Sequence, residues 1–149
     1  MKAEVINFYG VREPYGQLSN FAPFAIELDG LTWPTAEHYF QAQKFPGTPH
    51  AETIRNAKGG RAAAKAGRSR SHPLRSHWLQ VRDDVMRIAL HAKFTQHAQL
   101  TELLLGTGDA RLVEHTAKDR YWGDGGDGSG DNRLGALLME LRAQLGAGE

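Results

Sequence analysis

Residues 119–135 read DRYWGDGGDGSGDNRLG, a stretch that combines one tryptophan with closely spaced glycines and aspartates. Trp122 lies among Asp119, Asp124 and Asp127, and five glycines separate it from a leucine-rich segment. Glycine allows a positive φ and a close approach of the backbone to another group, at a cost in folding entropy. A hydrophobic core has little use for such aspartates, and a linker has little use for a tryptophan. From this stretch alone, two interpretations stay open: a mobile surface loop, or a loop that surrounds a ligand.

The composition predicts a single globular domain over residues 1–149. Of the 149 residues 40% are hydrophobic, and the net charge is +1. No apolar run approaches the roughly 18 residues that a membrane span needs, and the start MKAEVINFYG lacks the apolar stretch of a signal peptide. We therefore expect a cytoplasmic protein with no membrane partner. The absence of cysteine excludes disulfides, thiolate catalysis and zinc–thiolate sites.

The charges are distributed unevenly along the chain. A series of basic residues contains no acidic residue between its members: Arg55, Lys58, Arg61, Lys65, Arg68, Arg70, Arg75 and Arg82. Acidic residues cluster later: Asp109, Glu114, Asp119, Asp124, Asp127 and Asp131. This asymmetry suits a ligand with a phosphate at one end and a cation-like reacting centre at the other. It equally suits two solvated faces of opposite sign.

The periodicity of the chain predicts an α+β fold, mostly helical with a small antiparallel sheet. Apolar spacing and turn residues predict strands over 4–9 and 111–116, a β-hairpin over 21–33, and helices over 36–45, 49–57, 60–66, 78–94 and 98–105. The hairpin turn is Asp29-Gly30, a strong two-residue signal. Asp131 or Asn132 is expected to cap a last helix with a buried leucine stripe.

Several binding motifs that occur in glycine-rich or histidine-containing proteins are missing from this sequence. The P-loop sequence Gly-Lys-Ser/Thr is missing, and an EF-hand that began at Asp124 would need a glutamate where Gly135 stands. No third glycine completes a dinucleotide-binding pattern after Gly128-Ser129-Gly130. The seven histidines show no metal-ligand spacing. We therefore predict no metal and no cofactor.

Residues of the helix over 36–45 carry the first candidate chemistry. Glu37, Gln41 and Lys44 share one face, while Tyr39, Phe40 and Phe45 bury much of the same short helix. A desolvated lysine can act as a neutral nucleophile on an anomeric carbon, and a nearby carboxyl group can shuttle the proton. The alternative is an ordinary solvent-exposed polar stripe.

The glycine-rich stretch carries the second candidate chemistry. Trp122 is well placed to stack on a planar ring, and Asp119 and Asp124 could stabilise positive charge that develops on a ribose. The Asn132 side chain could bind hydroxyls or a base edge, and the amides at the start of the last helix favour an anion.

These residues resemble the NADAR (YbiA-like) family over almost the whole chain. The resemblance is carried by five segments: Asn7-Phe8-Tyr9, Gly16-Gln17-Leu18-Ser19-Asn20-Phe21, DGLTWPTAEHYFQAQKF over 29–45, Leu112-Val113-Glu114, and Trp122-Gly123-Asp124-Gly125 through Asn132-Arg133-Leu134-Gly135. The block over 33–45 is long and unusual, so the match is specific. The basic region over 55–75 is less characteristic and is where substrate choice could differ.

The resemblance implies a metal-independent N-glycosidase. Members hydrolyse the C1′–N bond of ribosylamino-pyrimidine phosphates of riboflavin synthesis, and others remove ADP-ribose from guanine in nucleic acid. The second hypothesis is a non-catalytic module that binds NAD or ADP-ribose. A Schiff-base-like lysine adduct has been proposed for the family, and Lys44 is the best match for that lysine.

The resemblance also implies a role for each site residue. Glu37 would be the acid/base, Lys44 the nucleophile or electrostatic partner, and Asp119 and Asp124 the stabilising carboxylates. The substrate-binding residues would be Arg12, Gly16, Ser19, Asn20, Phe21, Trp122, Gly123 and Asn132. We expect the glycine-rich loop to close against the helix over 36–45.

Overall fold

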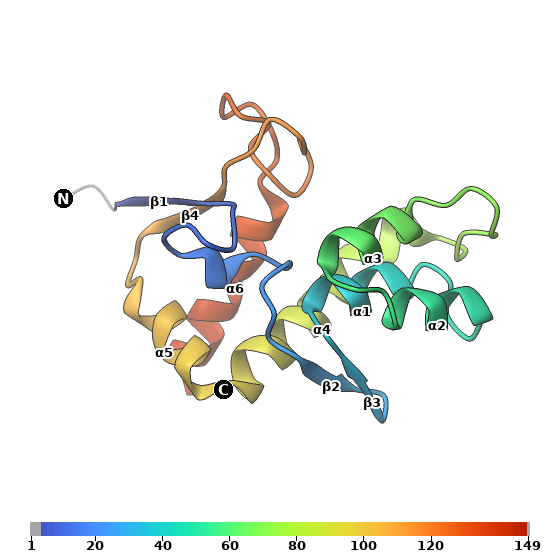
Figure 1. Ribbon diagram of the computed structural model, residues 1–149. Helices are drawn as coiled ribbons and strands as arrows, with labels where there is room; N and C mark the ends of the chain where they lie inside the picture. The colour runs from blue at the N-terminus through green and yellow to red at the C-terminus, as the bar shows by residue number, and fades with distance from the viewer. Residues whose placement is uncertain (1–3, 149) are drawn as a thin grey trace. The chain divides into compact units, whose positions relative to one another are not determined.

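The computed structural model describes residues 4–148, and its secondary structure confirms the predicted α+β class (Figure 1). Contacts divide the chain into two compact units. One contains the chain up to Ser19 together with the part from His97 onward, and the other runs from Asn20 to Gln96. The single domain over residues 1–149 stays a prediction.

The hairpin of the unit from Asn20 to Gln96 forms as its turn residues predict. Strand β2 (Ile26–Leu28) pairs antiparallel with β3 (Leu31–Trp33), with Leu28 opposite Leu31. Asp29 and Gly30 have φ of 57° and 74°, the positive values that a two-residue hairpin turn requires. This pair is the small antiparallel sheet that the sequence predicts.

Four helices complete this unit: α1 (Ala36–Ala42), α2 (Pro49–Arg55), α3 (Gly60–Gly67) and α4 (Trp78–Gln96). Thr35 and Thr48 cap α1 and α2 by accepting backbone amides. Helix α1 is three residues shorter than the 36–45 predicted, because the chain turns at Gln43 and Lys44 ahead of Pro46.

The core of this unit is aromatic and aliphatic. Phe40 of α1 packs on Trp78 of α4 with ring centroids 5.2 Å apart. The inner face of α4 includes Met86, Leu90 and Phe94, whereas Ile88, which the helical spacing placed inside, is 46% exposed. Within residues 4–148, no helix combines the length and apolar character that a bilayer crossing demands.

The other unit is built around a parallel strand pair. Strand β1 (Val5–Phe8) pairs with β4 (Arg111–Glu114) in the register Ile6 opposite Leu112. The 3-10 helix η1 (Gly16–Leu18), α5 (Ala98–Gly106) and α6 (Arg133–Gly146) complete it. Both strands were predicted, but their parallel pairing was not. Helix α6 buries its leucine stripe, including Leu134, Leu137, Leu138 and Leu141, and contacts β4.

Candidate active site

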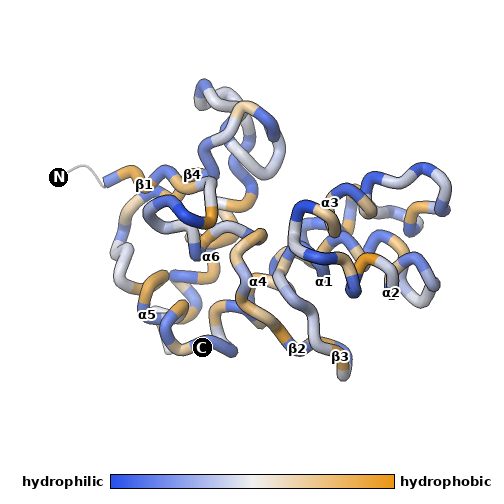
Figure 2. The backbone as a smooth tube through the Cα atoms, viewed as in Figure 1, coloured by the Kyte–Doolittle hydropathy of each residue, from blue (hydrophilic) through white to orange (hydrophobic). Residues whose placement is uncertain are grey.

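The glycine-rich loop between β4 and α6 is held by its own backbone. Backbone amides of residues 130–134 donate hydrogen bonds of 2.8 to 3.1 Å to backbone carbonyls of residues 120–124. The bonds are Gly130 N to Asp124 O, Asp131 N to Arg120 O, Asn132 N to Gly123 O, Arg133 N to Tyr121 O and Leu134 N to Trp122 O. The loop is coloured mostly blue to white in Figure 2, so its order does not come from apolar packing along its tip. These bonds favour an ordered loop over a mobile one.

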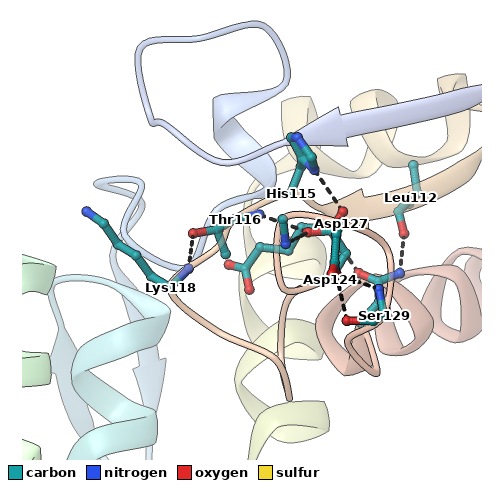
Figure 3. Close-up of polar contacts among 10 residues, drawn as sticks. Leu112, His115, Thr116, Lys118, Asp124, Asp127 and Ser129 are labelled. Atoms are coloured by element: carbon teal, nitrogen blue, oxygen red, sulfur yellow. Dashed lines mark hydrogen bonds and ion pairs between the residues drawn. The ribbon is translucent and has the colours of Figure 1, made fainter.

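Asp124 lies at the centre of this loop and is only 7% exposed. Its Oδ1 accepts the backbone N–H of Thr116 (3.0 Å) and of Gly126 (2.8 Å), and its Oδ2 lies 2.7 Å from His115 Nδ1 (Figure 3). Burial acts to raise the pKa of Asp124, but the bonds from His115 and from the two backbone amides outweigh it and leave the pKa below its ordinary value. The carboxylate is therefore charged at neutral pH.

Asp119 shapes the turn that presents Trp122. Its Oδ1 accepts the backbone N–H of Tyr121 (2.9 Å) and of Trp122 (2.8 Å). The Trp122 ring is half-buried and meets the Tyr121 ring edge-on, with centroids 4.9 Å apart. Among residues 4–148, no hydrogen bond to the second Asp119 oxygen occurs, so this oxygen can face another group.

Gly123 is required by packing inside the loop. A Cβ at this position would lie 2.9 Å from the carbonyl oxygens of Glu114 and Asp119, and 2.8 Å from Thr116 Cγ2, closer than real Cβ atoms approach. The structure thus provides a reason for this glycine that needs no ligand.

Asn132 occupies the N-cap position of α6 but does not cap it with its side chain. Its Oδ1 accepts Glu114 N and its Nδ2 donates to Leu112 O, both at 2.9 Å, so the amide ties the helix start to β4. The predicted cap position is confirmed at Asn132, but its side chain makes no capping hydrogen bond, because the backbone of β4 takes both amide groups. A substrate contact by Asn132 stays a prediction.

Glu37, Gln41 and Lys44 come together along α1 and the turn that follows. Glu37 is 8% exposed, and Gln41 Nε2 donates to its Oε2 at 2.7 Å. Burial lowers the pKa of Lys44; the Glu37 charge works against this, and the Arg68 charge adds to it. The reading of these residues as an exposed polar stripe is wrong, since Glu37 and Gln41 are buried.

The start of α1 and the end of α3 hold these side chains in place. Lys44 Nζ donates to Gly67 O at 3.4 Å, and a Cβ on Gly67 would overlap Gln41 Oε1. Asn20 O accepts Glu37 N at 3.2 Å, and Asn20 Nδ2 contacts Met86 Sδ at 3.1 Å. Asn20 is thus next to the carboxyl-bearing turn of α1.

The remaining predicted substrate residues differ in exposure. Phe21 is 39% exposed and lies over Gly60, within the same unit as Glu37. In the other unit, Arg12 is exposed on a turn, whereas Gly16 and Ser19 are buried at η1.

Two residues of chemical interest were not among the predicted site residues. His115 pairs with Asp124, and the only signal in the sequence was the position of His115 near the end of the strand predicted over 111–116. Lys93 of α4 is fully buried, and burial lowers its pKa to about 7. The only signal for it in the sequence was that Lys93 is a single lysine on an otherwise apolar helical face.

His38 is buried and has a structural role. Its Nδ1 meets Thr35 Oγ1 at 2.7 Å and its Nε2 donates to Ala57 O at 2.9 Å, while burial lowers its pKa. Over residues 4–148, no group of three or more His, Cys, Asp or Glu side chains is arranged to hold a metal ion.

Comparisons with known proteins match nearly the whole chain. The NADAR domain profile matches residues 7–146. The chain is 58% identical over 145 residues to the N-glycosidase YbiA of Escherichia coli, covering 97% of this chain and 91% of that protein. It is 43% identical to a riboflavin biosynthesis protein of Vibrio vulnificus, covering 94% of this chain but 38% of that protein. The NMR structure of E. coli YbiA superposes with a TM-score of 0.90 at 57% identity, covering 99% of this chain and 88% of that one.

Proposed function

The chain belongs to the NADAR family, and from this premise we propose that it is a metal-independent N-glycosidase, a hydrolase that cleaves the C1′–N bond between a ribose phosphate and an amino-pyrimidine or base. The family resemblance predicted from the residues is confirmed. The observation that carries the proposal is a lysine of lowered pKa, Lys44, beside a buried carboxyl group, Glu37. These are the nucleophile and the proton shuttle that a glycosyl transfer needs.

Lys44 acts as the nucleophile in the first half of the reaction. Burial favours the neutral amine, so Lys44 gives its proton to the Glu37 carboxylate and its Nζ lone pair bonds C1′. The electron pair of the C1′–N bond leaves with the base nitrogen, which takes a proton from Glu37. The new ammonium returns a proton to Glu37, so the step leaves a neutral amine adduct and a protonated carboxyl group.

Water completes the reaction in the second half. Its oxygen bonds C1′ and the water gives a proton to solvent, while the C1′–Nζ electron pair returns to Lys44, which receives a proton from Glu37. Solvent then returns a proton to the Lys44–Glu37 pair. Gln41, which donates to Glu37 Oε2 at 2.7 Å, holds the carboxyl group in one orientation. The products are the free base and the ribose phosphate.

Residues of the glycine-rich loop are proposed to serve the same substrate. The second oxygen of Asp119 stabilises positive charge on the ribose, and Trp122 stacks on the base. Asp124 is proposed as the second stabilising carboxylate. Arg12, Gly16, Ser19, Asn20, Phe21, Gly123 and Asn132 are the proposed binding residues.

We propose a ribosylamino-pyrimidine phosphate as the substrate, which agrees with the name of the Vibrio vulnificus relative. One observation favours an ADP-ribosyl group on guanine in nucleic acid as the alternative. Exposed basic side chains lie on α3 and on the segments that flank it, and they form no ion pair within the described residues: Lys58, Arg61, Lys65, Arg68 and Arg70. Such a surface suits a polyanion.

Release of free base from each substrate in the presence of a chelator tests the activity. The amine adduct on C1′ equilibrates with its ring-opened Schiff base, so reduction with borohydride during turnover traps a lysine adduct, and peptide mapping identifies the lysine. We expect the adduct on Lys44, and a loss of about 10²–10⁴ in turnover for Glu37→Gln and for Lys44→Ala. The exposed Lys118→Ala is the matched control and keeps full turnover.

Three results would contradict this assignment. Tight binding of ADP-ribose without release of any base would make the protein a non-catalytic reader. An adduct on Lys93 would move the nucleophile to α4. A mild effect of both Glu37→Gln and Lys44→Ala would remove α1 from the chemistry.

A further inference from the structure

The side chain of Gln41 has one hydrogen-bonding atom that the proposed mechanism does not use. We propose that Gln41 is a specificity-determining residue, and that its Oε1 accepts a hydrogen bond from the 2′-hydroxyl of the substrate's ribose. This inference rests on the proposed N-glycosidase function, which places C1′ of that ribose beside Lys44 and Glu37. It adds a chemical requirement to the substrate: a ribosyl group is cleaved in preference to a 2′-deoxyribosyl group.

Gln41 lies between the two residues that are proposed to act on C1′, and all three belong to the unit from Asn20 to Gln96. It follows Glu37 by one turn of α1, and its Nε2 donates to Glu37 Oε2 at 2.7 Å. Lys44 comes three residues later, and its backbone N donates to Gln41 O at 3.2 Å. A substrate group that is bound by the Gln41 side chain is therefore next to the reacting carbon.

The other end of the Gln41 amide lacks a donor. Its Oε1 is buried, and within residues 4–148 no group hydrogen-bonds it. The residue is 7% exposed, and Oε1 lies against the Cα of Gly67, since a Cβ on Gly67 would overlap it. Helices α1 and α3, which carry these two residues, pack side by side (Figure 1). A buried amide oxygen without a donor destabilises the fold, so a ligand that brings a donor to it is bound more tightly.

Asn20 shows the same shortage of donors beside Glu37. It is 5% exposed, and its Oδ1 is likewise buried with no hydrogen-bond partner in the described part of the chain. Its Nδ2 donates at 3.1 Å to the Met86 thioether, a weak acceptor, and its backbone O accepts Glu37 N at 3.2 Å. Two buried oxygens beside one turn of α1 thus lack donors, and the hydroxyl groups of a ribose are donors.

The substrate's chemistry selects the 2′-hydroxyl as the donor for Gln41. C1′ is bonded to the ring oxygen, which can only accept, and to the leaving nitrogen, which the proposed mechanism assigns to Glu37. The hydroxyl on C2′ is then the nearest remaining donor. The Gln41 side chain is flexible, so a small rotation carries Oε1 from Gly67 to this hydroxyl. The bond strengthens as positive charge develops on the ribose, because the hydroxyl becomes a better donor.

The competing explanation is that Gln41 only holds Glu37 and that the Gly67 Cα–H group is a sufficient partner for Oε1. The two are separated by measuring kcat/KM for a ribosyl substrate and for its 2′-deoxyribosyl analogue on the same preparation of each protein. In Gln41→Met, loss of the bond to Glu37 lowers both values, whereas loss of Oε1 lowers only the value for the ribosyl substrate. We expect the ratio of the two values to fall about 10- to 100-fold from the wild type to Gln41→Met. The intrinsic difference in reactivity between the substrates cancels in this comparison.

The half-buried Gln43, at the end of α1, provides the matched control: Gln43→Met should keep the ratio of the wild type. The ratio does not depend on the fraction of protein that is folded. If Gln41→Met releases too little base, calorimetry with ribose 5-phosphate and 2-deoxyribose 5-phosphate gives the same comparison from binding.

An unchanged ratio in Gln41→Met, or an equal fall in Gln43→Met, would refute the inference, while base release by the wild type leaves the proposed function standing. Absence of base release from the ribosyl substrate by both the wild type and Gln43→Met would refute the proposed function and the inference with it.

Discussion

Replacement of Lys93 by methionine should stabilise the protein at neutral pH. Lys93 is fully buried in α4, with Nζ 5.9 Å from the Phe24 ring centroid and 5.2 Å from that of Phe94. Burial lowers its pKa from 10.5 to about 7. Methionine has a similar length and flexibility and no charge, so it fills the same space without the cost of a buried ammonium group.

The size and the sign of the effect follow from linkage. Each tenfold change in proton affinity corresponds to about 1.4 kcal/mol, so the fall to about 7 corresponds to roughly 5 kcal/mol of cost for charging Lys93 in the folded state. Between about pH 7 and 10.5 the unfolded chain binds more protons than the folded one, so the free energy of unfolding rises with pH. Loss of the interactions that the amine makes, those with the two rings among them, offsets part of the gain. We expect Lys93→Met to be about 1–3 kcal/mol more stable than the wild type at pH 7.

Urea unfolding of both proteins at several values between pH 7 and pH 10 measures this difference. The stabilisation by Lys93→Met should shrink as pH rises, because the unfolded wild type binds less of its extra proton as the pH approaches 10.5. Lys118→Met, at an exposed lysine, controls for the loss of one charge and should change stability by less than about 0.5 kcal/mol. A variant that is less stable than the wild type by the same amount at every pH would show that the folded protein accommodates the charged amine, and would refute the reasoning.

Two further substitutions test how the candidate site is held. Thr35→Ala removes the cap of α1 and the bond to His38 Nδ1, so chemical denaturation should show a loss of about 1–2 kcal/mol that Thr35→Ser recovers; an unchanged stability would contradict the capping role. Asn132→Ala leaves Glu114 N and Leu112 O without their partners, so we expect a loss of about 2–4 kcal/mol in the free energy of unfolding. If Asn132→Ala instead lowered base release and left stability intact, its amide would serve the substrate.

The amino-acid sequence alone predicts the local elements and the types of reactive side chain that they carry. Alternation and the Asp29-Gly30 turn predicted the β2–β3 hairpin, and helical spacing predicted α1 to α6, because these signals are read from neighbouring residues. The aromatic side chains within the block over 33–45 also predicted that Glu37 would be shielded from water, as it is.

The partner of each side chain is known only from the folded chain. Residue spacing predicts which face of an element is buried but not what covers that face. The parallel pairing of β1 with β4 and the complete burial of Lys93 could therefore not be predicted from it. The same holds for the polar atoms of the glycine-rich loop. Asp124 and Asn132 were predicted to serve a ligand, and the fold adds that their side chains hydrogen-bond His115 and backbone amides and carbonyls. A buried polar group must be paired, and residue spacing alone does not tell which donor or acceptor pairs it.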